Sequence, residues 1–365
     1  NLLQTYLDEF HLDALVLNPS PTLEHLTGLR LHLMERPMMA VFPREGLPLV
    51  ILPELEALQL QKLSGEWNSA LYSDDPGTWD EVFKAGLQPY AARLQRVGVE
   101  PLHMRVLESG YLQRALPQAE LVDATELAAN LRLRKDEEEI ALMRRAAEAA
   151  QTALLATLGK VRLGMSERQI AAELIQQILR VGSDAKLPFE PIVSIAENAA
   201  NPHATPSDRV LGLNEVLLID YGVSHQGYFS DITRTFYTGE LSPDLQKAAD
   251  LVYQANRAAR EGGRAGMPAG GIDDLARSVI REGGMGEFFT HRTGHGLGRE
   301  THEAPYMFAG NPLILEPGMV FTIEPGIYLP GVGGIRIEDD VVVRADHLES
   351  LTSLPRRVLP LSLFQ

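Results

Sequence analysis

The first third of the chain alternates between short apolar runs and longer segments with helical spacing. Apolar runs of strand length occur at 14–19 (ALVLNP), 38–42 (MMAVF), 48–52 (PLVIL) and 96–100 (RVGVE). Between the last two runs, residues 78–96 place apolar side chains at the spacing of an amphipathic helix. This alternation predicts an α/β unit.

A change of character follows at 126–158, which is rich in Ala, Leu, Glu and Arg. We expect one long helix here, and its charged opening, LRLRKDEEE, suits a domain junction near residue 130. A further helix is expected to begin at Ser166, which can form a capping box with Gln169, and to stop at Gly182.

The rest of the chain shows one architectural pattern twice, in which helices are followed by a pair of strands. The expected strands lie at 191–195, 215–222 and 227–239, and a last pair lies around a Pro/Gly-rich turn within 319–343. The expected intervening helices lie at 243–263 and 272–282. The echo concerns architecture and is not an alignable sequence repeat.

Length and composition narrow the class of protein. At 365 residues the chain exceeds what one hydrophobic core usually supports, so we expect two domains. The net charge of −16 would repel nucleic acid and anionic membranes, and no apolar run approaches the roughly 20 residues of a membrane span. The lack of cysteine excludes disulfides and thiolate chemistry, and no GxSxG serine motif occurs. We therefore expect a cytoplasmic protein that uses carboxylates, imidazoles and hydroxyls.

Both predicted strand pairs carry acidic residues in apolar surroundings, namely Asp220, Asp231, Glu324 and Glu338. An isolated ionised carboxylate is costly in a protein core, so such a group is protonated, paired with a cation or bound to a metal. Arg234 and Arg336 are the nearby cations in the sequence and are too few for four acids. Divalent ions would neutralise the cluster directly.

His295, within HRTGHGLG, adds a nitrogen ligand flanked by glycines that allow close backbone approach. Five ligands are too many for one tetrahedral zinc ion, and this oxygen-rich set suits two divalent ions about 3.5–4 Å apart. We expect Mn²⁺, with Co²⁺ or Zn²⁺ able to substitute. Taken singly, Asp220 fits a strand-end acid, Glu324 a turn acid and His295 a core histidine, so it is their joint occurrence that favours a metal centre.

Four motifs carry a resemblance to a known family: FSDITRTF, HRTGHGLGRETHEAP, FTIEPGIY and GIRIEDDVVV. In order and spacing they resemble the proline-specific pita-bread metallopeptidases, Xaa-Pro dipeptidase (prolidase) and aminopeptidase P. The segments LNPSPTLEHLTGL and RVGVE are similar to that family's creatinase-type N-terminal domain. The resemblance implies an α/β two-domain protein, with the creatinase-type domain at 1–130 and the pita-bread catalytic domain at 131–365. It also implies a pseudo-symmetric fold around two metal ions, and a homodimer.

The same resemblance implies roles for residues outside the ligand set. His203 in ANPHATP is similar to a histidine that contacts the substrate or intermediate, and His302 in THEAP to one that stabilises the developing oxyanion. His291 is similar to a substrate-pocket histidine, with a loop histidine bonded to the backbone as the alternative. Arg336 would orient a ligand carboxylate, with an ordinary ion pair as the alternative.

The resemblance implies metal-dependent hydrolysis of an Xaa-Pro bond, with Glu324 as the proton shuttle. We favour an Xaa-Pro dipeptidase, because Arg299 replaces an apolar residue of many relatives and would bind the proline carboxylate of a dipeptide. A surface arginine is the alternative for Arg299. Three other functions stay open: an aminopeptidase P acting on longer peptides, a non-catalytic relative that binds partners, and another enzyme of this fold such as methionine aminopeptidase or creatinase.

Overall fold

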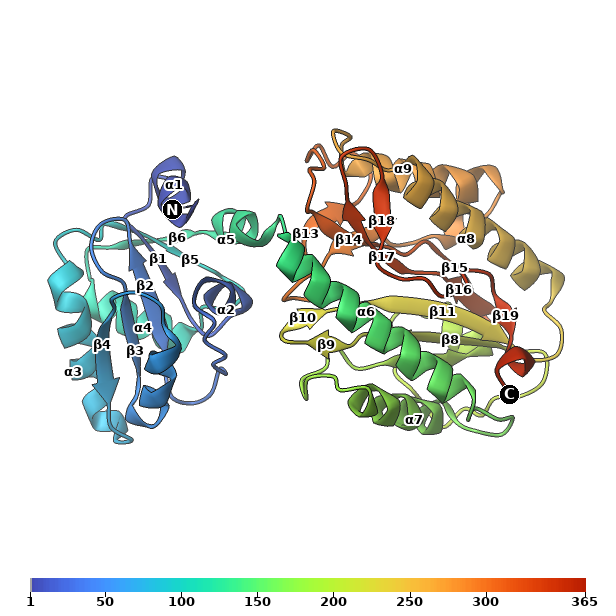
Figure 1. The fold of residues 1–365 in the computed structure, drawn as a ribbon, viewed down its shortest axis with the longest axis horizontal. Helices are drawn as coiled ribbons and strands as arrows, with labels where there is room; N and C mark the ends of the chain where they lie inside the picture. The colour runs from blue at the N-terminus through green and yellow to red at the C-terminus, as the bar shows by residue number, and fades with distance from the viewer. Residues whose placement is uncertain (1) are drawn as a thin grey trace. The chain divides into compact units, whose positions relative to one another are not determined.

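The computed structural model describes residues 2–365 and divides them between Arg132 and Leu133 into two units (Figure 1). Each unit has hydrophobic clusters of its own and combines helices with sheets. Both are therefore mixed α/β structures, as the apolar runs predict. None of the helices in the described range has the length and apolarity that crossing a bilayer requires.

The first unit is built on a six-stranded mixed sheet with the order β4-β3-β2-β1-β5-β6. Its strands are β1 (Ala14–Leu17), β2 (Met39–Pro43), β3 (Leu49–Pro53), β4 (Asn68–Tyr72), β5 (Arg96–Val99) and β6 (Glu120–Asp123). Its helices are α1 (Leu2–Glu9), α2 (Pro21–Thr27), α3 (Pro76–Leu87), α4 (Val106–Ala115) and α5 (Thr125–Arg132), with 3-10 segments η1 (Glu54–Lys62) and η2 (Gln88–Tyr90).

Alternate side chains of β1 enter different parts of the first unit's core. Ala14 and Val16 pack in a cluster with α3 and α4, whereas Leu15 and Leu17 pack in a cluster with α1 and α5. The sheet is therefore covered on both faces. This explains why its central strands are continuous apolar runs with no polar alternation.

The second unit consists of two halves of similar design. The first half comprises α6 (Glu137–Leu158), α7 (Glu167–Arg180), β7 (Ile192–Ile195), η3 (Ala196–Ala200), β8 (Val216–Tyr221), β9 (Ser224–His225), β10 (Tyr228–Phe229) and β11 (Ile232–Tyr237). The second half comprises α8 (Pro243–Gly262), α9 (Gly270–Glu282), η4 (Gly286–Phe288), β12 (Gly294–Gly296), β13 (Glu303–Met307), β14 (Val320–Ile323), β15 (Gly326–Leu329), β16 (Gly333–Arg336), β17 (Asp339–Val343) and β18 (Leu348–Ser350). The chain closes with β19 (Leu359–Pro360) and η5 (Leu361–Phe364).

The two main sheets of this unit have the orders β19-β11-β8-β7 and β13-β12-β14-β17-β18. Helix α6 packs against both of them, since Ile140 joins a cluster with Val320 of β14 while Leu154 joins a cluster with β8 and β11. Helices α8 and α9 pack on the other face of β14, where Phe321 points. Figure 1 shows α6 crossing the strands of both halves. One helix therefore ties the two sheets together.

The predicted single helix at 126–158 is wrong, because residues 133–136 separate α5 from α6. Asp136 starts α6 anew with a capping box: its carboxylate accepts from the Glu139 N–H at 2.8 Å, and its own N–H donates to the Glu139 carboxylate at 2.9 Å. Before it, the Lys135 N–H donates to the carbonyl of Gly318 at 2.8 Å. This distant contact interrupts a segment whose helix propensity is high throughout.

Two other helices follow local signals. Helix α3 ends at Leu87, earlier than the predicted 78–96, because Pro89 has no N–H to continue it. The predicted capping box of α7 is present: the Ser166 hydroxyl accepts from the Gln169 N–H at 3.2 Å. After α7 the chain turns at Gly182, whose φ of 88° is left-handed.

Residues 319–343 form four strands and not the expected two. Pro325 separates β14 from β15, and Glu338 lies between β16 and β17. Asp231, expected inside a strand, lies one position before β11. Three of the four predicted acids, including Glu324, thus lie at the ends of strands. There they are free of the strict in-and-out alternation of a strand and can turn towards one another.

The capping box of α6 gives a stability prediction. We expect Asp136→Ala to lower the free energy of unfolding by about 1 kcal/mol, because it leaves a first-turn N–H of α6 without its acceptor. Denaturant unfolding measures this loss. Glu138→Ala, on an exposed neighbour in the same turn, is the control and should change stability by no more than a few tenths of a kcal/mol. Equal effects of the two substitutions would contradict a specific capping role.

Candidate metal centre

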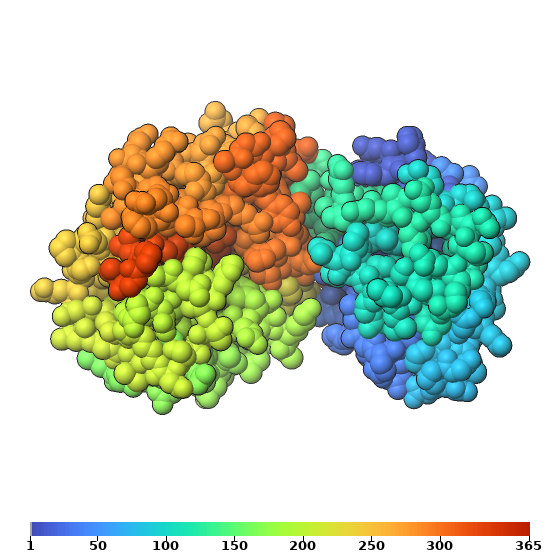
Figure 2. All heavy atoms as spheres, turned by 180° about the vertical axis from the view of Figure 1, so that it is seen from behind, coloured from blue at the N-terminus to red at the C-terminus, as the bar shows by residue number. Residues whose placement is uncertain are grey.

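A cavity of about 800 Å³ opens in the second unit. Its rim comes from segments near 188–206 in the first half and 291–302 in the second, which face each other across the hollow as yellow-green and orange surfaces in Figure 2. All of the predicted site residues except Arg299 line it, namely His203, Asp220, Asp231, His291, His295, His302, Glu324, Arg336 and Glu338. The structure therefore brings together residues spread over more than a third of the chain.

The imidazole of His295 directs its unprotonated nitrogen, Nε2, towards the acids. Its Nδ1 lies 3.1 Å from the carbonyl of Gly296, so this nitrogen carries the proton and Nε2 has a free lone pair. Nε2 lies 3.7 Å from Asp231 and 3.5 Å from Glu324. A side chain at Gly294 would put its Cβ 1.8 Å from the carbonyl oxygen of Thr322, so close backbone approach does require glycine here.

Asp231 and Glu338 form the tightest group with His295. One ligand atom from each of the three residues lies within 4.8 Å of the others. Thr233 donates its hydroxyl to Glu338 at 2.6 Å, and the Asp231 N–H donates to Asp340 at 3.1 Å. These bonds fix the Glu338 carboxylate and the backbone of Asp231, whereas Asp231 Oδ1 is buried and has no hydrogen-bond partner.

Asp220, the last but one residue of β8, and Glu324, just after β14, complete the set. One oxygen of Asp220 accepts from the Arg336 guanidinium, and the other is buried without a hydrogen-bond partner. Besides its approach to His295, Glu324 accepts one weak hydrogen bond, 3.5 Å long, from the Thr322 hydroxyl. Arg336 is therefore the cation that pairs directly with one of these four acids, as the count of nearby arginines predicted.

The protonation of the cluster reflects burial among like charges. Withdrawal from water and the neighbouring carboxylates raise the pKa of Asp231 and that of Glu338 well above their usual range. Withdrawal from water also raises the pKa of Glu324 to about 8. Burial lowers the pKa of His295 well below its usual value, so the ring is neutral. The arrangement is costly for the protein alone and is relieved by positive charge.

A directed chain of hydrogen bonds lies behind Asp220. Arg336 Nη1 donates to the Tyr328 hydroxyl at 2.8 Å, and Tyr328 lies 2.8 Å from His291 Nε2. His291 Nδ1 in turn lies 2.7 Å from the carbonyl of Arg292. Burial lowers the pKa of His291 to about 4, so this histidine is neutral and both its nitrogens are engaged. The sequence contained no signal for Tyr328, because a strand tyrosine is ordinarily a packing residue.

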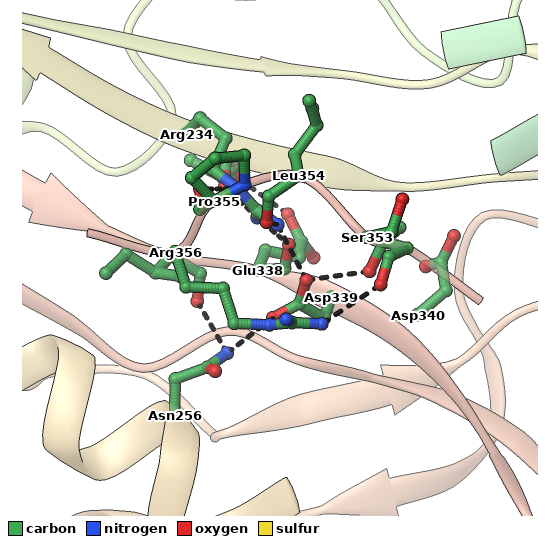
Figure 3. A network of polar contacts seen from close by, with 12 residues as sticks. Arg234, Asn256, Glu338, Asp339, Asp340, Ser353, Leu354, Pro355 and Arg356 are labelled. Carbon is green, nitrogen blue, oxygen red and sulfur yellow. Dashed lines mark hydrogen bonds and ion pairs between the residues drawn. The ribbon is translucent and has the colours of Figure 1, made fainter. Parts of the chain in front are cut away.

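Asp339, next to Glu338, was missed by the sequence analysis. Figure 3 shows its carboxylate where Arg234, Arg356 and Asn256 meet, at 2.7, 2.8 and 3.0 Å. Burial alone would raise the pKa of Asp339, but the two arginines outweigh it and hold that pKa below its usual range. Arg234 thus pairs with Asp339 and neutralises none of the four predicted ligand acids. The signal was available, since Asp339 lies in the same apolar run.

Of the remaining predicted residues, the two histidines line the cavity and Arg299 does not. His203 and His302 both lie on the rim of the cavity, and the rings of His302 and His295 touch edge to face with centroids 4.1 Å apart. Arg299 differs from the expectation, because its guanidinium stacks on the Tyr228 ring at 4.2 Å and does not line the cavity. Besides Arg336, the arginine that lines the cavity is Arg292, whose guanidinium lies 4.5 Å from the centre of the Tyr306 ring.

The donor set fits divalent ions. Two buried carboxylate oxygens lack partners, a neutral imidazole turns its lone pair to the same place, and the pKa values show uncompensated negative charge. Hard and borderline divalent cations prefer this combination of oxygen and imidazole donors. Nothing in the set suits a thiolate metal, since the chain has no cysteine.

Fold and site together define a metal-dependent peptidase. The chain belongs to metallopeptidase family M24, whose profile matches residues 141–345, and the profile of the Creatinase/Prolidase N-terminal domain matches residues 1–134. This confirms the two-domain class expected from the motifs. It also supports the use of divalent metal ions.

Curated and solved relatives cover nearly the whole chain. The Xaa-Pro dipeptidase of Lactobacillus delbrueckii subsp. lactis is 32% identical over 361 residues, 98% of each chain. The prolidase of Thermococcus sibiricus superposes with a TM-score of 0.91 at 33% identity, covering 98% of this chain and 97% of that one. The X-Pro aminopeptidase of Thermotoga maritima superposes with a TM-score of 0.84 at 29% identity, covering 98% and 99%.

The raised pKa values predict how stability depends on pH without metal. The pKa of Glu324 is about 8 in the folded chain and near its lower usual value when unfolded, so the folded state binds more protons between these values. Its contribution to stability is therefore lost as pH rises through about 8. We expect the unfolding midpoint of chelator-treated protein to fall between pH 6 and pH 9, and the rise caused by Mn²⁺ to grow over that range.

Thermal unfolding at each pH, with chelator or with Mn²⁺, measures this. Glu324→Gln removes the titrating group and should flatten the dependence in chelator. A metal-free midpoint that stays level or rises to pH 9 would contradict the assignment of these acids to an uncompensated buried cluster.

Proposed function

We propose that this chain is an Xaa-Pro dipeptidase that binds two divalent ions through five ligands, Asp220, Asp231, His295, Glu324 and Glu338. The observation that carries the proposal is the cluster of carboxylates that shares one cavity with a single paired cation, Arg336. Relatives named Xaa-Pro dipeptidase and prolidase match over essentially the whole chain and support the substrate class. Retention of every ligand position argues against a non-catalytic binding protein.

When bound, the ions lower the pKa of water and polarise the scissile carbonyl. Glu324 is the residue suited to move protons, because one of its oxygens faces the other ligands and only a weak hydrogen bond from Thr322 holds it. It would take the proton of the attacking water and deliver it to the departing proline nitrogen. His302 and His203, on opposite rims of the cavity, would donate hydrogen bonds to the developing oxyanion.

The bond to proline imposes its own demand on the site. A proline nitrogen in a peptide bond carries no N–H, so the enzyme cannot recognise this bond through that hydrogen. Selection must come from the shape of the cavity and the position of the scissile carbonyl. Apolar side chains such as Pro188, Phe189 and Ile192 line the cavity and suit a pyrrolidine ring.

A dipeptide also presents a carboxylate directly after its proline, which a dipeptidase must neutralise. Arg292 is placed for this, because it lines the cavity and its guanidinium is braced by Tyr306. Arg299, the residue favoured from the sequence, is held by Tyr228 at a distance from the lining. We therefore transfer the proposed carboxylate contact from Arg299 to Arg292, and His291 supports it from behind through the Arg292 carbonyl.

Several finer assignments belong to this proposal. Mn²⁺ is the proposed metal, because the ligands are oxygen-rich with one imidazole, and Co²⁺ or Zn²⁺ would substitute. The domain division at 1–130 and 131–365 is retained as proposed from the motifs. The homodimer and the cytoplasmic location stay predictions from family resemblance and composition.

Removing one ligand charge tests the metal assignment. We expect Asp231→Asn to bind less metal and to lose at least about 100-fold in kcat on an Xaa-Pro dipeptide, since even residues that only support a ligand cost 10–100-fold. Metal content and turnover are measured on the same Mn²⁺-treated sample. Asp346→Asn, on an exposed acid, is the control and should match the unmodified chain. Full metal occupancy with unchanged turnover in Asp231→Asn would end the assignment.

Substrate length tests the role of Arg292. We expect Arg292→Ala to lower kcat/KM for an Xaa-Pro dipeptide by about 10–100-fold, the value of one charged hydrogen bond, with a smaller effect on a peptide extended by several residues. Arg257→Ala, on the exposed face of helix α8, is the matched control. Arg299→Ala should leave the ratio between dipeptide and longer peptide unchanged. Better cleavage of longer peptides by the unmodified chain would instead favour an aminopeptidase P.

A further inference from the structure

The loop that joins β12 to β13, residues 297–302, carries His302 at its end. The His302 ring is exposed, touches His295 edge to face and has no hydrogen-bond partner within residues 2–365. Its own hydrogen bonds therefore do not set its direction. Whatever orients this ring must hold the loop backbone close to position 302.

The residue after His302 belongs to a buried ion pair. Lys135 Nζ lies 2.5 Å from Glu303 Oε1, and their side chains are only 2% and 5% exposed. Neither side chain lines the cavity, and the proposed reaction uses neither. Two charges removed from water interact favourably only in good geometry, because their desolvation must be offset by direct contact. The pair is therefore a stringent geometric restraint at position 303.

Both ends of the loop meet at this ion pair. Gly298, near the start of the loop, packs so closely that a Cβ there would lie 2.8 Å from Glu303 Oε1 and 2.8 Å from Lys135 Cε. The carbonyl of Gly298 accepts from the Phe229 N–H at 2.8 Å. The loop therefore packs on the buried pair near its start and is joined directly to it at its end, which leaves it few ways to move.

A second anchor comes from the same end of α6. Arg299, in the middle of the loop, donates to the Tyr228 hydroxyl at 3.1 Å, and Tyr228 donates to Glu139 at 2.6 Å. Lys135 and Glu139 lie on either side of the N-cap of α6. The start of α6 thus holds the loop at two places, which gives Arg299 a structural part in place of the substrate contact.

We propose that the buried Lys135–Glu303 ion pair positions His302, by fixing the closure of the 297–302 loop so that the imidazole faces the reacting carbonyl. The proposal rests on the oxyanion role proposed above for His302. Lys135 and Glu303 are positioning residues, because they act through the loop and touch neither substrate nor metal ligands.

A double-mutant cycle tests this. Glu303→Gln keeps the shape of the side chain and removes its charge, so we expect kcat to fall about 10–100-fold, as a misplaced group does, with a smaller change in KM. Bound metal should stay at the unmodified level. His302→Ala alone should lower kcat about 10²–10³-fold. In that background Glu303→Gln should lower kcat by less than about twofold, because the group it positions is gone.

A second variant guards against misfolding, because Glu303→Gln leaves Lys135 buried without a full counter-charge. Lys135→Met/Glu303→Leu removes both charges and lets apolar packing replace the directional contact. It should show a similar loss of kcat and the same dependence on His302. Lys160→Met breaks the more exposed Lys160–Glu173 pair and, as the matched control, should leave kcat unchanged.

Equal losses from Glu303→Gln with and without His302 would overturn the positioning proposal. So would an unmodified kcat in either folded variant at full metal content. Failure of the underlying oxyanion role has a different signature, since His302→Ala alone would then keep the unmodified kcat with metal bound.

Discussion

The site depends on a short ladder of bonds between β11 and the segment that joins β16 to β17. The Thr233 hydroxyl donates to the Glu338 carboxylate at 2.6 Å, and the Glu338 N–H returns a bond to the Thr233 carbonyl at 3.1 Å. Two positions further, the Thr235 hydroxyl donates to the Arg336 carbonyl at 2.9 Å. This ladder holds together carboxylates from two halves of the chain that would otherwise repel one another in a weakly polar space.

Asp231 and Asp339 show how the protein treats buried acids in two opposite ways. Both are withdrawn from water, yet the pKa of Asp231 is raised well above its usual range and that of Asp339 is lowered. The difference lies in their partners, because Arg234 and Arg356 contact Asp339, whereas the charged neighbours of Asp231 are other acids. Arg234 also donates to the Glu338 carbonyl at 2.5 Å. The neutralised acid thus anchors the backbone beside an acid that is left for a cation.

The comparison of Asp231 with Asp339 shows which features of the site can be predicted from the sequence. The energetic argument on buried carboxylates depends only on residue type and apolar surroundings, and it pointed to acids that do share one cavity. The same argument applies to Asp339, which follows Glu338 in the same apolar run. Other features depend on distant contacts, such as the break before α6, where Lys135 bonds to Gly318. Arg299 was expected at the site because it is four residues from His295, but its guanidinium stacks on Tyr228 and does not line the cavity.

The residues that would select a dipeptide over a longer substrate lie in other segments than the acids of the site. The frame is shared with a structure named as a prolidase and with one named as an X-Pro aminopeptidase, so the fold and the sheets do not decide substrate length. The proposed ligand acids lie in or beside strands of both halves, whereas the cavity rim comes from connecting segments such as 188–206. Rim residues can change without disturbing the ladder that holds the acids. We therefore propose that specificity for the free proline carboxylate lies in rim cations such as Arg292, and that the loop anchored beneath His302 sets the position of its imidazole.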